Sequence, residues 1–297
     1  MSMKFFRLTT FALLLSLSVP VWALNVLTSI KPIQMISYEL MAGVSQPDVL
    51  LAPNTSPHDY ALRPSDVKRI KQADLVIWFG EGLEPFLSKV LSHQTNQLMI
   101  SHIKGVPFRH FSASHHDDGH HHHGNINPHF WLGVEQVRVV AKAITARLIQ
   151  QDPDHATQYQ ENLTHFLAQL TKTDNQIQTQ LAAYQHYPYY VFHDAYEYFE
   201  AHYHLNNIGH FTVSPERKPG AKTLIEIRTK LKEQPNVCIF SEPQFLPSVI
   251  TSVTRGTSAK VGTLDPLATD IPLAKGSYFR FLTSLSQSYT NCFKMAQ

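Results

Sequence analysis

The sequence predicts an α/β protein with two Rossmann-like domains, each built on a parallel sheet, joined by one long rigid helix. Short apolar runs alternate with amphipathic stretches in both halves of the chain, as in doubly wound parallel sheets. The 297 residues are long for one hydrophobic core and suit two domains of ordinary size. Between the halves, residues 153–184 carry apolar side chains at steps of three, four and seven, which predicts one helix of about 32 residues.

We expect residues 1–23 to be a secretory signal peptide. Lys4 and Arg7 precede the apolar run 11–17, and the small residues around Ala23 suit a signal peptidase. The apolar run is too short for a membrane span, and no cysteine near residue 23 offers the lipid anchor of a bacterial lipoprotein. These features predict a mature protein that is soluble outside the inner membrane.

The charge balance argues against two classes of partner. The 25 basic and 23 acidic residues become equal in number once Lys4 and Arg7 leave with the signal peptide. A chain whose basic and acidic residues balance, histidine aside, has no excess positive charge with which to bind nucleic acid or anionic lipid. We therefore expect no nucleic-acid partner, and we expect a monomer.

Residues 24–150 form the predicted N-terminal domain, which the histidine-rich loop 114–124 interrupts. Gly43 ends the first amphipathic stretch, and Ser65 is placed to cap the next helix. The near-continuous apolar run at 74–79 predicts a strand that is buried on both faces of its sheet. The expected strands are 25–30, 49–51, 74–79 and 97–101, and the expected helices are 32–41, the segment after Ser65, 83–91 and 134–149.

Residues 151–185 form the predicted linking helix, and residues 186–297 form the C-terminal domain. The helix is too long to cross over within one small sheet, so we interpret it as a strut between domains. A helical hairpin broken at the polar gap near Asp174 is the alternative. The second domain is expected to contain strands 189–194, 207–213, 237–240 and 260–264 and helices 195–203, 222–232, 245–254 and 278–293.

The loop 114–124 is crowded with histidines that stand among Asp and Gly without any apolar period. Such a tract is typical of a solvated, metal-binding segment and not of a core element. A purification tag or a low-complexity accident is the alternative, although the tract is internal and interleaved with Asp. We predict an auxiliary metal loop made of His115, His116, His120, His121, His122 and His123.

Three other histidines are candidates for a central metal site: His58, His129 and His193. Each lies at a strand end or in a loop, and in open parallel sheets ligands bind beyond the carboxyl ends of the strands. If the two sheets face each other, the three imidazoles converge in the interdomain cleft at the distance that zinc requires. For the fourth ligand, Asp265 or water is preferred over Glu242, because Asp265 directly follows its strand. The competing histidines are His93, His102, His110, His155, His165, His186, His202, His204 and His210.

The chain has two cysteines, Cys238 and Cys292. In an oxidising compartment such a pair most simply forms one disulfide, which closes a loop of about 55 residues and contributes roughly 4 kcal/mol. Two thiolate metal ligands are the alternative, but no close-spaced Cys or His partner accompanies either cysteine.

Five ordered motifs resemble those of the ZnuA family of periplasmic zinc-binding proteins, the solute-binding components of high-affinity zinc ABC transporters. The similarity covers nearly the whole mature chain. The motifs are the segments at 57–69, 129–132, 191–199, 241–245 and 262–267.

The resemblance implies two Rossmann-like domains joined by a long helix, with one zinc ion in the cleft. The resemblance also implies that His58, His129 and His193 are the zinc ligands, and that the protein delivers the ion to an inner-membrane ABC permease. The cysteine pair matches the family's disulfide positions. Some members have an acidic residue just before the first metal histidine, whereas this chain has Pro57, so water or Asp265 is expected as the fourth ligand.

We therefore predict a solute-binding protein and not an enzyme, with Zn²⁺ as the transported ligand. A secreted zinc hydrolase, with Glu242 as its base, is the alternative from another class, although no His-Glu-x-x-His signature occurs. A manganese-specific relative would need oxygen-dominated ligation. Because imidazole must be unprotonated to bind metal, affinity is expected to fall as pH drops through the histidine range.

Overall fold

The computed structural model describes residues 23–111, 126–212, 219–234, 236–245 and 248–297. Apart from Ala23, the predicted signal peptide lies outside these residues, and so does the whole predicted metal loop 114–124. Within the described part, no helix is long and apolar enough to span a bilayer.

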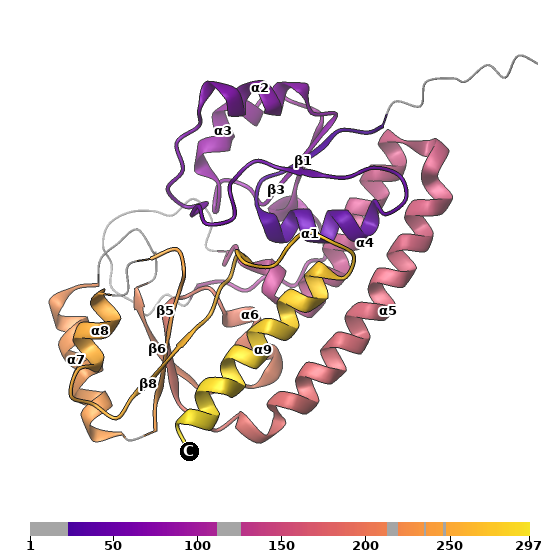
Figure 1. The fold of residues 1–297 in the computed structure, drawn as a ribbon. Coiled ribbons are helices and arrows are strands. Elements are labelled where there is room, and N and C mark those ends of the chain that lie inside the picture. The colour runs from indigo at the N-terminus through magenta and orange to yellow at the C-terminus, as the bar shows by residue number, and fades with distance from the viewer. Residues whose placement is uncertain (1–22, 112–125, 213–218, 235, 246–247) are drawn as a thin grey trace, which may run out of the picture.

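The N-terminal lobe is built on a four-stranded parallel sheet with the order β2-β1-β3-β4 (Figure 1). The strands of its middle, β1 and β3, are fully buried, as the continuous apolar run at 74–79 predicted. The elements are β1 (Val26–Thr28), α1 (Lys31–Leu40), β2 (Asp48–Val49), α2 (Pro64–Gln72), β3 (Leu75–Trp78), α3 (Pro85–Leu91), β4 (Gln97–Met99) and a 3-10 turn at Ile100–His102.

The C-terminal lobe repeats this arrangement, with the parallel strand order β6-β5-β7-β8. Tyr190 and Phe192 of β5 face the core under α7 and α8, whereas Tyr189 and Val191 face α9 on the other side of the sheet. The elements are β5 (Tyr189–His193), α6 (Glu197–Tyr203), β6 (Asn207–Thr212), α7 (Ala221–Glu233), β7 (Cys238–Ser241), α8 (Ser248–Thr254), β8 (Lys260–Thr263) and α9 (Ser277–Met295).

A long helix, α5 (Ala156–Leu181), joins the two lobes along one side of the molecule (Figure 1). It follows α4 (Val134–Gln151) and has a 3-10 turn at each end, Pro153–His155 and Ala182–Tyr184. The helix is unbroken at Asp174, so the hairpin alternative is wrong. The polar gap has a partner instead, because the Asp174 carboxylate accepts hydrogen bonds from His202 (2.8 Å) and Tyr203 (3.0 Å) of α6. The fold class predicted from the sequence is thus confirmed.

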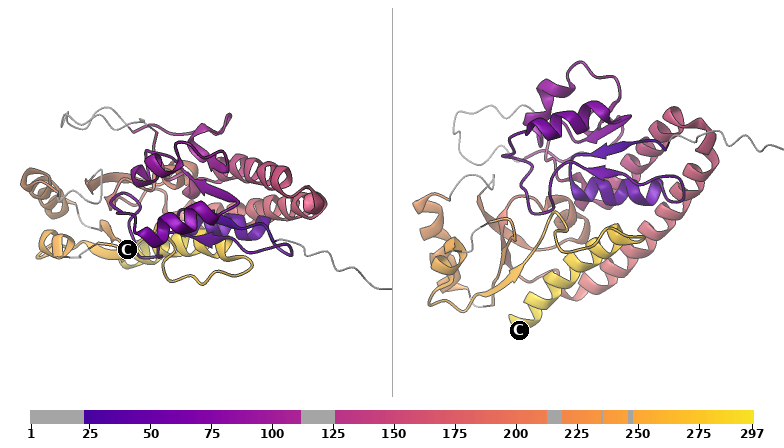
Figure 2. Two further views of the ribbon diagram at one scale, coloured as in Figure 1. Left: turned by 90° about the horizontal axis from the view of Figure 1, so that it is seen from above. Right: turned by 45° about the horizontal axis from the view of Figure 1, so that its top comes forward.

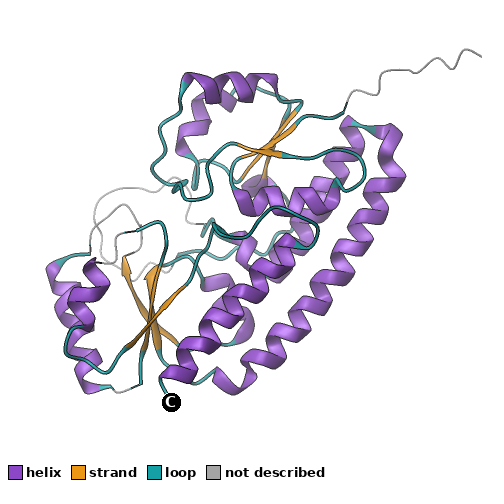
Figure 3. Ribbon diagram, viewed as in Figure 1, coloured by secondary structure: helices purple, strands orange, loops and turns teal. Residues whose placement is uncertain are grey.

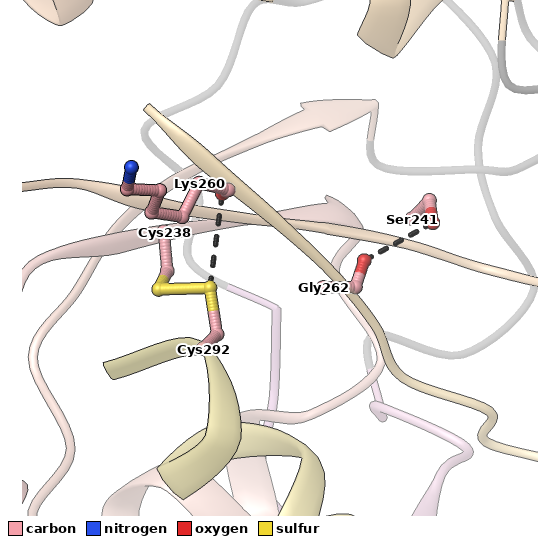
Figure 4. Close-up of a disulfide and its surroundings, with 5 residues drawn as sticks. All are labelled: Cys238, Ser241, Lys260, Gly262 and Cys292. Atoms are coloured by element: carbon pink, nitrogen blue, oxygen red, sulfur yellow. Dashed lines mark hydrogen bonds between the residues drawn. A yellow bond between two sulfur atoms is a disulfide. The ribbon is translucent and has the colours of Figure 1, made fainter. Parts of the chain in front are cut away.

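Helix α9 makes a second connection between the lobes, and Figures 2 and 3 show it lying beside α5. At its N-terminal end, the backbone N–H of Gly276 donates to the Glu39 carboxylate of α1 at 2.5 Å. Near its C-terminal end, Cys292 forms a disulfide with Cys238 of β7, with a Cα–Cα distance of 6.1 Å (Figure 4). The helix is therefore fastened to the first lobe at one end and to the second lobe at the other.

The predicted cap of α2 is wrong by two positions. The helix begins at Pro64, so Arg63 is the N-cap residue and Ser65 already lies in the first turn. The capping carboxylate is that of Asp66, which accepts hydrogen bonds from the Arg63 backbone N–H (2.9 Å) and the Tyr60 hydroxyl (2.7 Å). Proline takes the first helical position because its fixed φ suits the helix and its missing N–H costs nothing there.

Candidate metal centre

The three candidate histidines come from different elements of both lobes. His58 lies in the loop between β2 and α2, and His129 immediately precedes a 3-10 turn at Phe130–Leu132 that leads into α4. His193 is the last residue of β5. His129 and His193 are each 3% exposed, and His58 is half-buried. The fold thus places all three side chains between the two lobes.

One ring nitrogen of each histidine lies within 4.8 Å of the others. The Nε2 atoms of His129 and His193 are 3.3 Å apart. Two nitrogens that are each about 2.0–2.1 Å from a tetrahedral zinc ion lie roughly 3.4 Å apart. The pair is therefore already spaced as two ligands of one metal ion.

The tautomer of His129 follows from its contact with Asn127. The Asn127 side-chain amide donates through Nδ2 to the Glu197 carboxylate (3.2 Å), so Oδ1 is its acceptor atom. This oxygen lies 2.8 Å from His129 Nδ1 and also accepts the His129 backbone N–H at 3.1 Å. His129 Nδ1 therefore carries the proton, and the lone pair is on Nε2.

His193 is held in the same way by Glu242. Its Nδ1 atom lies 2.6 Å from Glu242 Oε1, and both side chains are buried. A carboxylate accepts and does not donate, so His193 Nδ1 carries a proton, and in the neutral tautomer Nε2 presents the lone pair. Two Nε2 lone pairs thus face each other across 3.3 Å, an arrangement that a shared cation makes favourable.

The wall of the site is largely apolar. The cavity next to the histidines is lined by Pro57, Trp131, Phe245, Pro266 and Leu267, together with the polar side chains of Glu242 and Gln244. Trp131 is fixed by a hydrogen bond from its indole N–H to the Pro266 carbonyl (2.7 Å). An apolar wall lowers the local dielectric constant and so strengthens the interaction of a cation with its nitrogen ligands.

The structure does not bring the other predicted residues into this group. The Asp265 carboxylate accepts hydrogen bonds from the backbone N–H groups of Leu267 (3.0 Å) and Thr269 and from Gln244 Nε2 (2.8 Å). Among the described residues, His58, His129 and His193 are the only set of three or more His, Cys, Asp or Glu side chains spaced to hold a metal ion. The six histidines of the predicted metal loop lie outside the described residues.

The sequence interpretation missed Asn127. An acceptor for the ring of the histidine two residues later was not predicted at this position. The same residue lies at the base of the histidine-rich segment, where Arg109 and Asn127 are clamped to α6. Within this clamp, the Asn127 backbone N–H donates to the Arg109 carbonyl (2.8 Å), and His110 and Ile126 form an antiparallel bridge. Two contacts reach α6: the Tyr198 hydroxyl donates to the Asn127 carbonyl (2.7 Å), and Arg109 forms an ion pair with Glu197 (2.7 Å).

Burial lowers the pKa of His129 well below 6.5, and the neighbouring His193 and His58 lower it further. In the unfolded chain this imidazole binds a proton below about pH 6.5, whereas in the folded protein it stays neutral. Unfolding therefore takes up a proton at low pH, and stability is lost as pH falls below about 6.5.

We expect the zinc-free protein to lose up to about 1.4 kcal/mol of unfolding free energy per pH unit at this group, and the His129→Gln variant to show a shallower slope. Urea unfolding of both proteins between pH 7.5 and 5 measures the two slopes. Equal slopes would contradict the assignment of the lowered pKa to His129.

Replacing Asn127 by alanine is expected to weaken zinc binding about 10- to 100-fold, because the imidazole of His129 loses the partner that fixes its tautomer and ring orientation. A competition titration with a chromophoric chelator measures the change. Asn175→Ala, at an exposed position of α5, is the matched control and should bind zinc like the unmodified protein. An unchanged affinity for the Asn127 variant would show that this contact does not orient the ligand.

Known proteins match this chain over most of its length. The sequence profile of the ZnuA family, described as a periplasmic zinc-uptake complex component A, matches residues 26–292. The high-affinity zinc uptake system protein ZnuA of Yersinia pestis is 43% identical over 289 residues, which are 91% of each chain. The ZnuA protein of Haemophilus ducreyi is 38% identical over 287 residues, 90% of this chain and 93% of that one.

Solved structures share the fold. A crystal structure of ZnuA superposes with a TM-score of 0.77 at 26% identity and covers 91% of this chain and 99% of its own. The periplasmic zinc-binding protein TroA from Treponema pallidum superposes with a TM-score of 0.78 at 20% identity, covering 92% of this chain and 99% of its own, which shows likeness of fold alone.

Proposed function

The chain belongs to the ZnuA family of zinc-uptake components, and from this premise we propose that His58, His129 and His193 bind the zinc ion that it carries. Members of this family are solute-binding components of zinc uptake systems and not enzymes. The protein is accordingly one that captures zinc for uptake, and the hydrolase alternative is set aside. Zinc is its cargo and does not take part in a reaction.

The main support for the proposed ligands is the distance of 3.3 Å between the Nε2 atoms of His129 and His193. Asn127 and Glu242 hold a proton on Nδ1 of each ring, so the neutral tautomers direct their Nε2 lone pairs toward each other. Binding of zinc to these tautomers then needs no transfer of a proton between the two nitrogens of a ring, and little reorientation of the buried rings.

Three neutral imidazoles in an apolar cavity favour zinc over Mn²⁺ and Mg²⁺, which prefer oxygen ligands. Raw affinity would not exclude Cu²⁺ or Ni²⁺ from the same ligands. Pro57 offers no ligating atom, and the Asp265 carboxylate is engaged by its own loop and by Gln244. We therefore favour water as the fourth ligand.

The proposal places the mature chain, after removal of residues 1–23, in the periplasm as a monomer that docks on an inner-membrane ABC permease. We assign residues 24–150 and 186–297 to the two domains, and residues 151–185 to the link between them. Because α5 and α9 both run along the two lobes, release of zinc would follow small tilts of the lobes in preference to wide hinge opening. No role in nucleic-acid binding is proposed.

Elemental analysis and a competition titration test the proposal. The mature protein is expected to bind one zinc ion tightly per chain, and His58→Ala and His193→Ala are each expected to lose that tight binding. A strain that lacks its own zinc-binding component should grow at low zinc with the unmodified protein and should fail with either variant. Tight zinc binding that persists in both variants would overturn the ligand set.

The histidine-rich loop stays a separate proposal. His115, His116, His120, His121, His122 and His123 would bind additional zinc more weakly and raise its local concentration near the cleft. Deletion of residues 115–123 should lower the total number of bound zinc ions while the tight site is retained. An unchanged number of bound ions would remove the auxiliary role and would leave the central site unaffected.

A further inference from the structure

Gln244 lies in the loop that follows β7 and lines the same cavity as the three histidines. Its side-chain nitrogen, Nε2, donates hydrogen bonds to Asp265 Oδ1 (2.8 Å) and to the hydroxyl of Thr269 (3.0 Å). Because an aspartate carboxylate can only accept, the nitrogen and not the oxygen of the amide must face Asp265. The orientation of the amide is thus determined by its neighbours.

The other branch of this amide, Oε1, is buried and accepts no hydrogen bond from any residue that the structure describes. Buried carbonyl oxygens nearly always have a donor, since an unsatisfied one loses its interaction with water and gains nothing in return. An acceptor without a donor in the wall of a ligand cavity indicates that the donor comes with the ligand.

Both lobes hold Gln244 in this position through the segment 265–269. The Asp265 carboxylate is bound by two backbone N–H groups of its own loop, so it cannot turn toward the cavity without breaking them. From the first lobe, the Lys31 ammonium group donates to the Thr269 carbonyl (2.8 Å), and the Thr269 hydroxyl donates to the Pro53 carbonyl (3.2 Å). Gln244 is therefore anchored at the junction of the lobes and not on a free loop.

We propose that Gln244 is a positioning residue for the fourth zinc ligand, and that its Oε1 atom accepts a hydrogen bond from a water molecule bound to the ion. This inference rests on the proposed function. Three imidazole nitrogens leave one tetrahedral position open, and a neutral acceptor in the wall of the same cavity favours a ligand that carries a proton. Water or hydroxide satisfies Oε1, whereas chloride or thiocyanate would place an anion without a proton against a buried oxygen.

In this proposal Asp265 does not bind zinc itself but orients the side chain of Gln244. Its carboxylate fixes the amide of Gln244, and Gln244 in turn lines the cavity. Glu242 lines the cavity as well, but it is bound to His193, so its replacement would disturb a zinc ligand directly. The side-chain amide of Gln244 donates to Asp265 and Thr269, which makes it a cleaner position to test than Glu242.

The test uses the full mature protein loaded with Zn²⁺ or with Co²⁺, whose visible spectrum reports the ligands of a four-coordinate site. Gln244→Met keeps the length of the side chain and removes the acceptor. Gln178→Met, at an exposed position of α5, is the matched control. Zinc affinity is measured by chelator competition, and thiocyanate is titrated into the cobalt-loaded proteins.

We expect Gln244→Met to bind zinc about three- to tenfold more weakly and to show the thiocyanate-dependent spectral change at a concentration at least about tenfold lower than the unmodified protein. Gln178→Met should match the unmodified protein in both measurements. Gln244→Ala serves as a second variant if the methionine variant does not fold, and it should respond to thiocyanate in the same direction.

Equal thiocyanate responses of the unmodified protein and a folded Gln244 variant would overturn the inference, and so would an unchanged zinc affinity. Neither outcome would contradict the proposed function. The proposed function fails if the unmodified protein binds no zinc tightly, or if the His58→Ala and His193→Ala variants still bind zinc tightly. The two failures are therefore distinguishable.

Discussion

Replacing His129 by alanine is expected to lower the affinity for zinc about a thousandfold. Tight zinc sites in proteins bind with about 10–16 kcal/mol shared among three or four ligands, so one ligand accounts for about 4 kcal/mol. The loss at His129 should be at the upper end, because its ring is buried and oriented by Asn127 before the metal binds. Chelator competition at pH 7.5 on metal-free protein measures the difference.

His165→Ala is the matched control for this prediction, since His165 is exposed on α5 and far in sequence from the cleft residues. It removes the same side chain and should leave the affinity unchanged. Circular dichroism and a thermal melt of the metal-free His129 variant establish that it is folded. A folded His129 variant with zinc affinity within about threefold of the unmodified protein would show that this imidazole is not a ligand.

Removal of the disulfide is expected to produce the largest loss of stability. Cys238 and Cys292 are 54 residues apart in sequence, and both are fully buried. On the chain-entropy estimate, a loop of this length contributes about 4 kcal/mol to the unfolding free energy. The double variant Cys238→Ala, Cys292→Ala should therefore unfold at a clearly lower urea concentration than the oxidised protein.

The disulfide lies on the opposite end of β7 from the metal centre, because Cys238 begins the strand that ends just before Glu242. At low temperature, where the double variant remains folded, one tight zinc ion per chain is accordingly expected. Urea unfolding of the metal-free proteins and a zinc titration of each separate the two effects. A double variant with unchanged urea midpoint would contradict the estimate.

Much of the fold was predictable because each local pattern is strong. The apolar run at 74–79 is short and nearly continuous, which favours a strand buried on both faces. The apolar period through residues 156–181 continues across Asp174 without a shift. The sequence could not show that Asp174 has partners on α6, since His202 and Tyr203 are distant in the chain. A polar residue in a helix looks the same from sequence whether it is solvated or paired with another element.

The candidate site was predictable in part. The choice of His58, His129 and His193 relied on their place at strand ends, and the structure does bring these three together; their role as ligands stays a prediction. Glu242 was considered as a fourth ligand or as a base, whereas in the structure its carboxylate holds His193. Asn127 and Gln244 carry no signal in a single sequence, because an amide is informative only once its two ends have identified neighbours.

The clamp at Arg109 and Asn127 has a practical consequence for engineering. Residues 109 and 127 are bonded to each other and to α6, so a change in the number of residues between them would not alter the register of His129. Closing a longer connection costs only slowly rising entropy, about 0.6 kcal/mol for each doubling of its length. A fluorescent domain could therefore be inserted there as a label, with His129 still held in place.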